Sequence, residues 1–437
     1  KPNINQVDNI IKRLFPLCRS VTGKGTNKSL KIIKELVPEL KIKSIASGEK
    51  IFDWTVPSEW NVKDAYVKNS KGEKVIDFKK NNIHLVGYSE PYSGILSKKE
   101  ILRHIHTIPN KPNWIPYRTS YYKKYWGFCC KHRALISDKF VGPFEVLVDT
   151  ELNPNGKLNY GEAFKKGEKN EEIVISTYCC HPSLANDNLS GLITAALLFN
   201  FLKKNTKRFS YRLAIVPETI GSLCFLKHHP DVKKIVGGTI VTTTAGPGKF
   251  SIKESFNKDH WINRISHSVL SAATNNNYIT YPFDPDGSDE RQYSSPMFRI
   301  PTPSIHKSRY CEYDEYHTSA DNLNFISAKN LLKTLNIYCD WINAVDRVCL
   351  PKRKNLGGEL QLGKRGLYPN LGGIQTIHLK TNKVNQKQKF NFTGAIRIQS
   401  HHLECFQWLM HMCDGNHSNF DIAERSGLNI KIVNESI

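Results

Sequence analysis

The segment EEIVISTYCCHPSLANDNLSGLITAALLFNFLKK, residues 171–204, decides the fold. Its first part, EEIVISTYC, is a run of apolar and β-branched residues that predicts a buried strand. Its second part, DNLSGLITAALLFNFLKK, predicts a helix that Asp187 and Asn188 can cap. Further along, YRLAIVPE (211–218) and IVGGTIVTTT (235–244) predict two more strands. This alternation of strands and helices predicts an α/β fold with a mostly parallel sheet.

The same unit continues on both sides of these strands. FRIPTPSI (298–305) predicts a last strand, and SAKNLLKTLNIYCDWINAV (327–345) predicts a closing helix. The helical apolar spacing at 7–20 and 27–40 places two further helices in this core. We therefore expect the core to comprise 1–49 and 156–348, in two pieces.

Residues 50–155 have a different sequence pattern, with short apolar runs separated by turns. The turns SKGEK (70–74) and NPNGK (153–157) are typical of hairpins. Aromatic residues gather in SYYKKYWGF (120–128), at Tyr121, Tyr122, Tyr125 and Trp126. We expect an inserted β-rich domain that walls a pocket.

The C-terminal part, 349–437, begins with a linker rich in glycine and lysine and continues with IRIQSHHLECFQWLMHMC, a predicted helix. NFDIAERSGLNIKIVNES (419–436) predicts two helices around a glycine turn, as in a winged-helix-like module. DNA binding would need basic residues on the second of these helices, which offers only Lys431. Because Asp421 and Glu424 lie on the first, we expect a packing or partner-binding module, with nucleic acid an unlikely partner.

Composition limits the function classes. The chain has 437 residues, 39% hydrophobic and 23% charged, which is typical of a globular protein of two or three domains. No stretch predicts a membrane span or a signal peptide, so a cytoplasmic location is expected by default. Eleven cysteines, an odd number without a CxxC pair, are expected to be mostly buried thiols. The net charge of +22 comes from lysines spread along the chain, which favours a compositional bias over a nucleic-acid or membrane surface.

Four residues of metal-ligand or base type follow predicted strands. His181 and Glu218 end two neighbouring strands, Asp187 opens the next helix, and His317 lies in EYHTSADN after the last strand. Carboxyl ends of parallel strands meet at one edge of a sheet, so these side chains can converge on zinc. Each residue alone has a plainer explanation: a hydrogen-bonded histidine, a helix cap or a turn cap. Spacing by itself leaves metal binding and these structural roles equally open.

Longer motifs resolve part of this ambiguity. CCHPSLANDNLSG, PETIGS, GSDERQY and YHTSADNL resemble the bacterial aminopeptidase-like family of zinc-peptidase fold, which is associated with polysaccharide biosynthesis. Stretches of the insertion, from DWTVPSEW to LNYGE, resemble the inserted domain of that family. LGKRGLYPNLGG and DGNHSNFDIAERSGL resemble its C-terminal winged helix. The resemblance covers nearly the whole chain.

The resemblance implies a zinc aminopeptidase-like site with His181, Asp187 and His317 as ligands. Co-catalytic relatives carry a Glu-Glu pair, where this chain has only Glu218. They also carry carboxylates where this chain has Ser183 and Ala245. One zinc ion is therefore expected rather than two, and Glu218 is expected to act as the general base.

The motif GSDERQY supplies candidates for substrate binding, namely Asp289, Glu290, Arg291 and Tyr293. Carboxylates would suit a free amine, and the arginine would suit an acidic group. The expected function is hydrolysis of an amide in a small peptide or an amide-bearing sugar, by a protein that could form homo-oligomers. Two alternatives stay open: a non-catalytic binding protein on the same fold, and a DNA-linked regulator.

Overall fold

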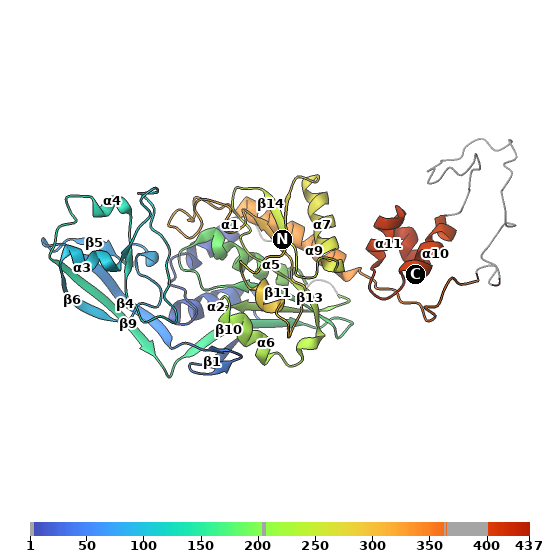
Figure 1. The fold of residues 1–437 in the computed structure, drawn as a ribbon, viewed down its shortest axis with the longest axis horizontal. Coiled ribbons are helices and arrows are strands. Elements are labelled where there is room, and N and C mark those ends of the chain that lie inside the picture. The colour runs from blue at the N-terminus through green and yellow to red at the C-terminus, as the bar shows by residue number, and fades with distance from the viewer. Residues whose placement is uncertain (1–3, 203–206, 362–363, 365–400) are drawn as a thin grey trace. The chain divides into compact units, whose positions relative to one another are not determined.

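The computed structural model describes residues 4–202, 207–361, 364 and 401–437. They form two compact units, Lys1–Asp346 and Arg347–Ile437. The centre of the first unit is a five-stranded sheet in the order β1-β10-β12-β11-β13. Its strands are β1 (Lys41–Ala46), β10 (Lys157–Lys165), β12 (Ser210–Val216), β11 (Glu172–Tyr178) and β13 (Ile235–Ile240) (Figure 1).

This sheet is mixed, so the expectation of a mostly parallel sheet was wrong. Strand β11 is parallel to β12 and β13, while β10 is antiparallel to both β1 and β12. The physical reason lies in the insertion. The chain leaves the sheet after β1 and returns to the same edge along β10, so the two strands run in opposite directions, like the arms of a wide hairpin.

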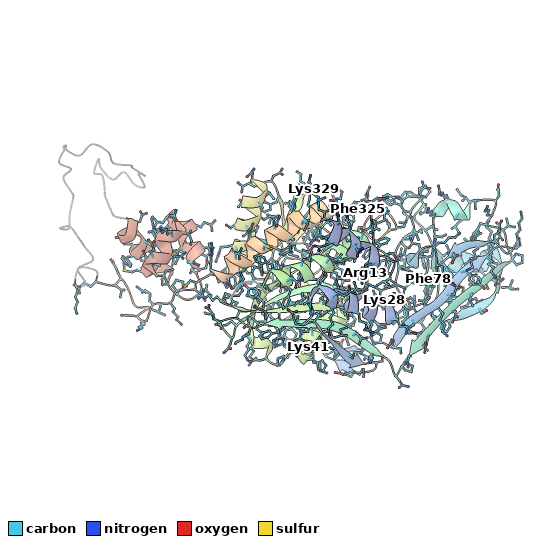
Figure 2. All side chains as sticks on the ribbon, turned by 180° about the vertical axis from the view of Figure 1, so that it is seen from behind. Arg13, Lys28, Lys41, Phe78, Phe325 and Lys329 are labelled. Carbon is cyan, nitrogen blue, oxygen red and sulfur yellow. The ribbon has the colours of Figure 1, made fainter. Side chains whose placement is uncertain are left out.

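Helices surround the parallel strands. They are α1 (Ile4–Leu14), α2 (Lys24–Leu36), α5 (Gly191–Leu202), α6 (Ile220–His228), α7 (Trp261–Thr274) and α9 (Ala328–Asp346). Helix α5 contacts β11, α2 and α9, whereas α6 contacts β10 and β12 (Figure 1). Nearly all residues of α5 are buried, as its uniformly apolar sequence predicts. Arg13 of α1 lies on the exterior (Figure 2) and pairs with Glu35 of α2 at 2.7 Å between Nη2 and Oε1.

A three-stranded sheet of the order β15-β14-β16 extends the core. It contains β14 (Phe250–Lys253), β15 (Ile279–Tyr281) and β16 (Ser304–Lys307). The strand expected at 298–305 therefore begins only at Ser304. Just before it, the carbonyl oxygens of Pro301 and Pro303 accept hydrogen bonds from the N–H groups of Gly238 and Ile240 in β13, which ties the two sheets together.

Residues 50–155, the predicted insertion, contain a four-stranded sheet in the order β5-β4-β9-β6, with β4 (Glu59–Lys68), β5 (Lys74–Asp77), β6 (Tyr92–Leu96) and β9 (Phe144–Asn153). The turn SKGEK joins β4 and β5 as an antiparallel hairpin, as predicted. The turn NPNGK instead leads from β9 to β10, which belong to different sheets. One continuous apolar cluster includes Val67 and Phe144 of the insertion as well as Val174 and Val216 of the central sheet.

Short elements complete the first unit. They are β2 (Lys50–Ile51), β3 (Trp54–Thr55), β7 (Ile105–His106), β8 (Phe128–Cys129), α3 (Lys98–Ile101), α4 (His132–Leu135) and α8 (Glu290–Tyr293), together with four short 3₁₀ or irregular helical turns at 82–84, 102–104, 185–190 and 232–234.

The second unit contains α10 (His401–Met412), α11 (Asn419–Ser426) and α12 (Ile430–Ser436). Ser418 and Asp421 form a capping box at the start of α11, and Gly427 turns the chain at its end with φ 69°. The two helices expected around a glycine turn are thus confirmed. The winged-helix assignment stays a prediction, because much of the sequence that would complete such a module, 365–400, lies outside the described residues.

Two expectations from composition can be compared with the structure. All eleven cysteines are unpaired, and seven of them are buried. Within the described residues, each helix is too short or too polar to cross a membrane.

Candidate functional site

The carboxyl ends of β11 and β12 place the first two site residues. These strands are parallel with Tyr178 opposite Val216, and the N–H of Cys179 donates to the Val216 carbonyl at 2.9 Å. His181 and Glu218 follow at the same edge of the sheet. Nε2 of His181 lies 3.8 Å from Oε2 of Glu218.

Asp187 lies in an irregular segment before α5. Its backbone is not helical, with φ −108° and ψ 89°, and its peptide bond to Asn188 is cis. The carboxylate of Asp321 accepts the N–H groups of three consecutive residues here: Ala185 at 3.2 Å, Asn186 at 2.6 Å and Asp187 at 3.0 Å. The side chain of Asp187 does not cap α5. It accepts a hydrogen bond from the Tyr178 hydroxyl at 2.5 Å instead.

His317 reaches the same point from the loop after β16. Its Nε2 lies 3.0 Å from Oδ2 of Asp187, and its ring centroid lies 5.3 Å from that of His181. The ring of Tyr316 stacks on the His317 ring at 3.9 Å. Because Asp321 follows His317 by four residues, the loop that carries one candidate ligand also holds the backbone of another.

These three residues fit a divalent metal ion. One ligand atom from each of His181, Asp187 and His317 lies within 4.8 Å of the other two, so all three can reach a shared zinc ion after small side-chain movements. Oδ2 of Asp187 is buried and receives no aligned hydrogen bond from the described residues. A buried carboxylate oxygen facing imidazole nitrogens is a donor set that zinc prefers.

The ionisation of the cluster supports the same fit. Burial lowers the pKa of His181 to about 4, so its ring is neutral and can donate a lone pair. Burial opposes the charge of Asp187, but His181 and His317 outweigh burial and lower its pKa to about 2. A neutral His181 ring and an ionised Asp187 carboxylate are the protonation states that metal binding requires of these two residues.

Carboxylates for a second metal are scarce at this edge. Thr219 follows Glu218 directly, and Ala245 is fully buried with its N–H bound to Oδ1 of Asn186 at 3.0 Å. A second cluster, Cys180, His181 and Glu218, has ligand atoms within 4.8 Å of one another but shares His181 with the first.

Glu218 lies beside the three candidate ligands, and a quarter of its side chain is exposed. Its N–H donates to Sγ of Cys180 at 3.3 Å. Burial, followed by the charges of Asp289 and Asp187, raises its pKa well above the usual carboxyl range. A raised pKa makes a carboxylate a stronger base, as a general base requires.

The four candidates in GSDERQY point in different directions. Asp289 is fully buried and bonds to Thr219 and Ser222 behind Glu218. Glu290 is buried too, and its Oε1 lies 2.7 Å from Nζ of Lys253. Tyr293 belongs to the apolar core, while Arg291 is exposed.

The structure brings in residues that the motif analysis did not single out. Tyr117 of the insertion lies over both histidines, with ring centroids 5.3 Å from His181 and 5.1 Å from His317. Its N–H donates to the His317 carbonyl at 2.8 Å. Arg19 donates from Nε to the His181 carbonyl at 2.9 Å. Tyr117 lies in the stretch that resembles the family's inserted domain, but only tertiary structure shows that its loop meets the His317 loop.

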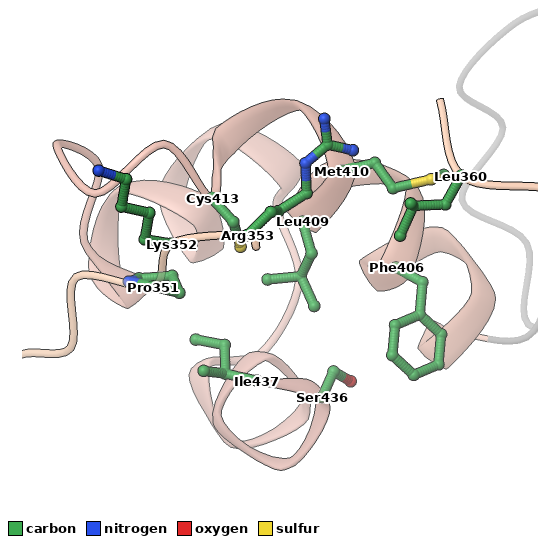
Figure 3. Close-up of a pocket in the computed structure, with 10 residues that line it drawn as sticks. All are labelled: Pro351, Lys352, Arg353, Leu360, Phe406, Leu409, Met410, Cys413, Ser436 and Ile437. Atoms are coloured by element: carbon green, nitrogen blue, oxygen red, sulfur yellow. The ribbon is translucent and has the colours of Figure 1, made fainter. Parts of the chain in front are cut away.

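Hollows elsewhere in the molecule lack such chemistry. One of about 310 Å³ lies in the second unit and is lined mainly by apolar side chains such as Phe406, Leu409 and Met410, with Arg353 among the few polar ones (Figure 3). Another, of about 480 Å³, is bordered by Phe256 and Arg299. Neither is lined by His181, Asp187 or His317.

Comparison with known proteins identifies relatives over nearly the whole chain. A Clostridium acetobutylicum protein named "Putative polysaccharide biosynthesis protein with aminopeptidase-like domain" is 39% identical over 433 residues, which cover 98% of this chain and 93% of that protein. The crystal structure of a peptidase, termed putative, from the same species superposes with a TM-score of 0.80 at 37% identity, over 99% of this chain and 93% of that one.

More distant structures share the fold. A zinc aminopeptidase from Bacillus subtilis has a TM-score of 0.55 at 12% identity, covering 78% of this chain and 94% of that one. A peptidase M28 precursor from Shewanella amazonensis has the same TM-score at 11% identity, covering 77% and 92%. The family described as a domain of unknown function, DUF4910, matches residues 8–348. The chain therefore belongs to the DUF4910 family, and its mixed α/β core has the fold of zinc aminopeptidases.

Proposed function

We propose that this protein is a zinc-dependent hydrolase of amide bonds. The observation that carries the proposal is the convergence of His181, Asp187 and His317, with a buried carboxylate oxygen facing the ring of His317 at 3.0 Å. These three residues would hold one zinc ion. The fold shared with zinc aminopeptidases supports the same assignment.

Zinc, when bound, would lower the pKa of a water molecule and polarise the substrate carbonyl. Glu218 would accept the proton of the attacking water and deliver it to the leaving nitrogen. Its position 3.8 Å from His181 places it beside the cluster, and its partial exposure leaves it accessible from solvent. Tyr117 would close one side of the site and restrict the substrate, because it lies against both histidine rings.

The substrate class that suits this site is a small peptide or an amide-bearing sugar. The open side of the cluster is formed by His317, with about a third of its side chain exposed, and by Glu218. The sugar alternative draws on the name of the Clostridium acetobutylicum relative, which refers to polysaccharide biosynthesis.

The proposal is tested by two measurements on the full chain. Zinc per protein is determined by mass spectrometry after purification and dialysis, for the wild type and for His317→Ala. Hydrolysis is then followed with a panel of aminoacyl p-nitroanilides, dipeptides and N-acetylated amino sugars. We expect close to one zinc per chain, lost in His317→Ala together with activity. A wild type that binds no zinc from a buffered solution would refute the metal centre.

A second candidate function is that of a non-catalytic binding protein, and Thr219 and Ala245 favour it because they stand where co-catalytic relatives carry carboxylates. In that case the wild type would bind zinc and still leave every amide in the panel intact. Binding of the same compounds, measured by calorimetry, would then identify the ligand class.

A further inference from the structure

The residue after the candidate base adopts a rare backbone conformation. Thr219 has φ 64° and ψ −80°, and the N–H of Ile220 donates to the Glu218 carbonyl at 2.9 Å. This is a γ-turn with positive φ at its centre, which is uncommon and strained. A β-branched residue makes it more costly still, since Cβ crowds the backbone at positive φ. Such strain persists only where surrounding contacts hold it, and it concentrates at functional sites.

Asp289 supplies the contacts that hold this turn. Its Oδ1 accepts the N–H of Thr219 at 2.7 Å and the hydroxyl of Ser222 at 2.8 Å. Thr219 is the first residue before α6 and makes no side-chain cap of its own. The carboxylate of Asp289 therefore ties Thr219 and the first turn of α6 to a loop seventy positions along the chain.

Asp289 is itself fixed in place. It is fully buried and directly precedes α8. The next residue, Glu290, binds Nζ of Lys253 and the hydroxyl of Tyr310, each at 2.7 Å. Lys253 is almost completely buried in β14. The loop that carries Asp289 is thus anchored to β14 through Glu290 and Lys253.

We propose that Asp289 is a positioning residue that holds Thr219 in its γ-turn and so aims the side chain of Glu218 at the metal centre. This inference rests on the proposed role of Glu218. It differs from a substrate-binding role, which would need an accessible carboxylate. It also differs from simple stabilisation of α6, because it makes the direction of the preceding side chain depend on Asp289.

The test is a double-mutant cycle between Asp289 and Thr219. Thr219→Gly is the informative partner, because glycine occupies positive φ without strain and keeps the turn with less help. Asp289→Ala removes the acceptor, and Asp289→Asn keeps an oxygen in its place. Asp286→Asn is the matched control, since Asp286 is exposed and lies in the same loop.

With zinc-loaded proteins and the best substrate of the panel, we expect Asp289→Ala to lower kcat by about 10²-fold, the usual effect of misplacing a catalytic group by about 1 Å. KM and zinc content should stay near wild type. Asp289→Asn should lose less, and Asp286→Asn nothing. Thr219→Gly combined with Asp289→Ala should recover at least about tenfold of the lost kcat. A raised KM at unchanged kcat, or no recovery in the double variant, would overturn the proposal.

Crystal structures of the same variants separate this inference from the proposed function. We expect Thr219 to leave positive φ, and the Glu218 side chain to turn away from His181, in Asp289→Ala but not in Asp289→Asn. If the wild type hydrolyses nothing, the proposed function fails while this geometric result still decides the positioning role. An unchanged Thr219 turn in Asp289→Ala would refute it. If Asp289→Ala does not fold, two other variants are compared instead. One is the double variant Thr219→Gly with Asp289→Ala, and the other is Asp289→Asn.

Discussion

Buried charged residues lie at both ends of strand β11, but their charges are balanced by protein groups to different extents. At its amino end, Glu172 accepts from Nη2 of Arg212 at 2.8 Å and lies 3.1 Å from Nε2 of His229. Arg212 also pairs with Glu162, which Lys43 approaches to 2.6 Å. Each charge at this end therefore has a partner of opposite sign.

At the carboxyl end the charged groups are not all paired with one another. His181, Asp187 and His317 converge, and the oxygen of Asp187 that faces His317 receives no aligned hydrogen bond from the described residues. His317 and Glu218 are partly exposed. Carboxyl ends of parallel strands are where α/β folds bind ligands. The comparison teaches that burial of charge does not identify a site. What distinguishes the two ends is whether the chain supplies its own counter-charges.

The largest expected effect on activity comes from Glu218→Gln, a substitution at the carboxyl end of β11. We expect turnover to fall about 10²–10⁴-fold, the usual contribution of a general base, while zinc content holds. Kinetics on the panel substrate and metal analysis of the same preparation measure both. Glu171→Gln is the control, because this side chain is 46% exposed and lies just before the amino end of β11. A loss of zinc together with turnover would make Glu218 a ligand, and no change in either would leave it a structural role.

Arg212→Met should act on stability and leave the carboxyl end intact. Removing the cation leaves Glu172 and Glu162 buried without their main partner, which typically costs about 3–5 kcal/mol. Urea unfolding followed by circular dichroism measures the free energy, and zinc content should match the wild type. Arg13→Met is the control, because its pair with Glu35 is exposed to solvent, where ion pairs contribute little to stability. If the two variants lowered the free energy of unfolding equally, the buried ion pairs at the amino end would not contribute more to stability than an exposed pair.

The ion pairs at the amino end of β11 should also make the stability of the protein depend on pH. Burial opposes the charge of Glu172, but hydrogen bonds from Arg212 and His229 outweigh it and lower the pKa to about 2. The folded pKa lies below the unfolded value of 4.5, so the native state binds fewer protons in between. The stabilisation is complete above about pH 4.5 and is lost as pH falls towards 2.

This dependence is isolated by urea unfolding of the wild type and of Glu172→Gln between about pH 2.5 and 6. The difference in free energy of unfolding between the two should be largest at the upper end of this range and shrink on acidification. A difference that stays constant over this range would show that Glu172 is not ionised against Arg212.

Strand ends were predictable from sequence, because apolar runs locate buried strands and ligand-type residues follow them directly. This was enough to nominate His181, Asp187, Glu218 and His317. The direction of β10 was not predictable. This strand is antiparallel to its neighbours because of where residues 50–155 leave the central sheet and return to it. The burial of the chemically suggestive side chains in GSDERQY was not predictable either. Glu290 turns inward to Lys253, a partner 37 residues away, which no local pattern reveals.

The smallest of these effects should come from Asp321, which links the two loops of the metal centre. Its carboxylate binds the backbone N–H groups of Ala185, Asn186 and Asp187, and it receives the Tyr313 hydroxyl at 3.1 Å. Asp321→Asn keeps the size of the side chain but replaces one acceptor oxygen by an amide donor. At least one backbone N–H then loses its partner, and the segment that orients Asp187 loosens.

Partners of this kind orient metal ligands without touching the metal, and their loss typically weakens metal affinity by about 10–100-fold. We expect that loss for Asp321→Asn in a competition titration with a zinc chelator, with the fold retained. Asp314→Asn is the matched control, because that side chain is 82% exposed in the same loop. An affinity for zinc equal to that of Asp314→Asn would show that the Asp187 segment holds its shape without Asp321. The open character of the carboxyl end would then rest on the three ligands alone.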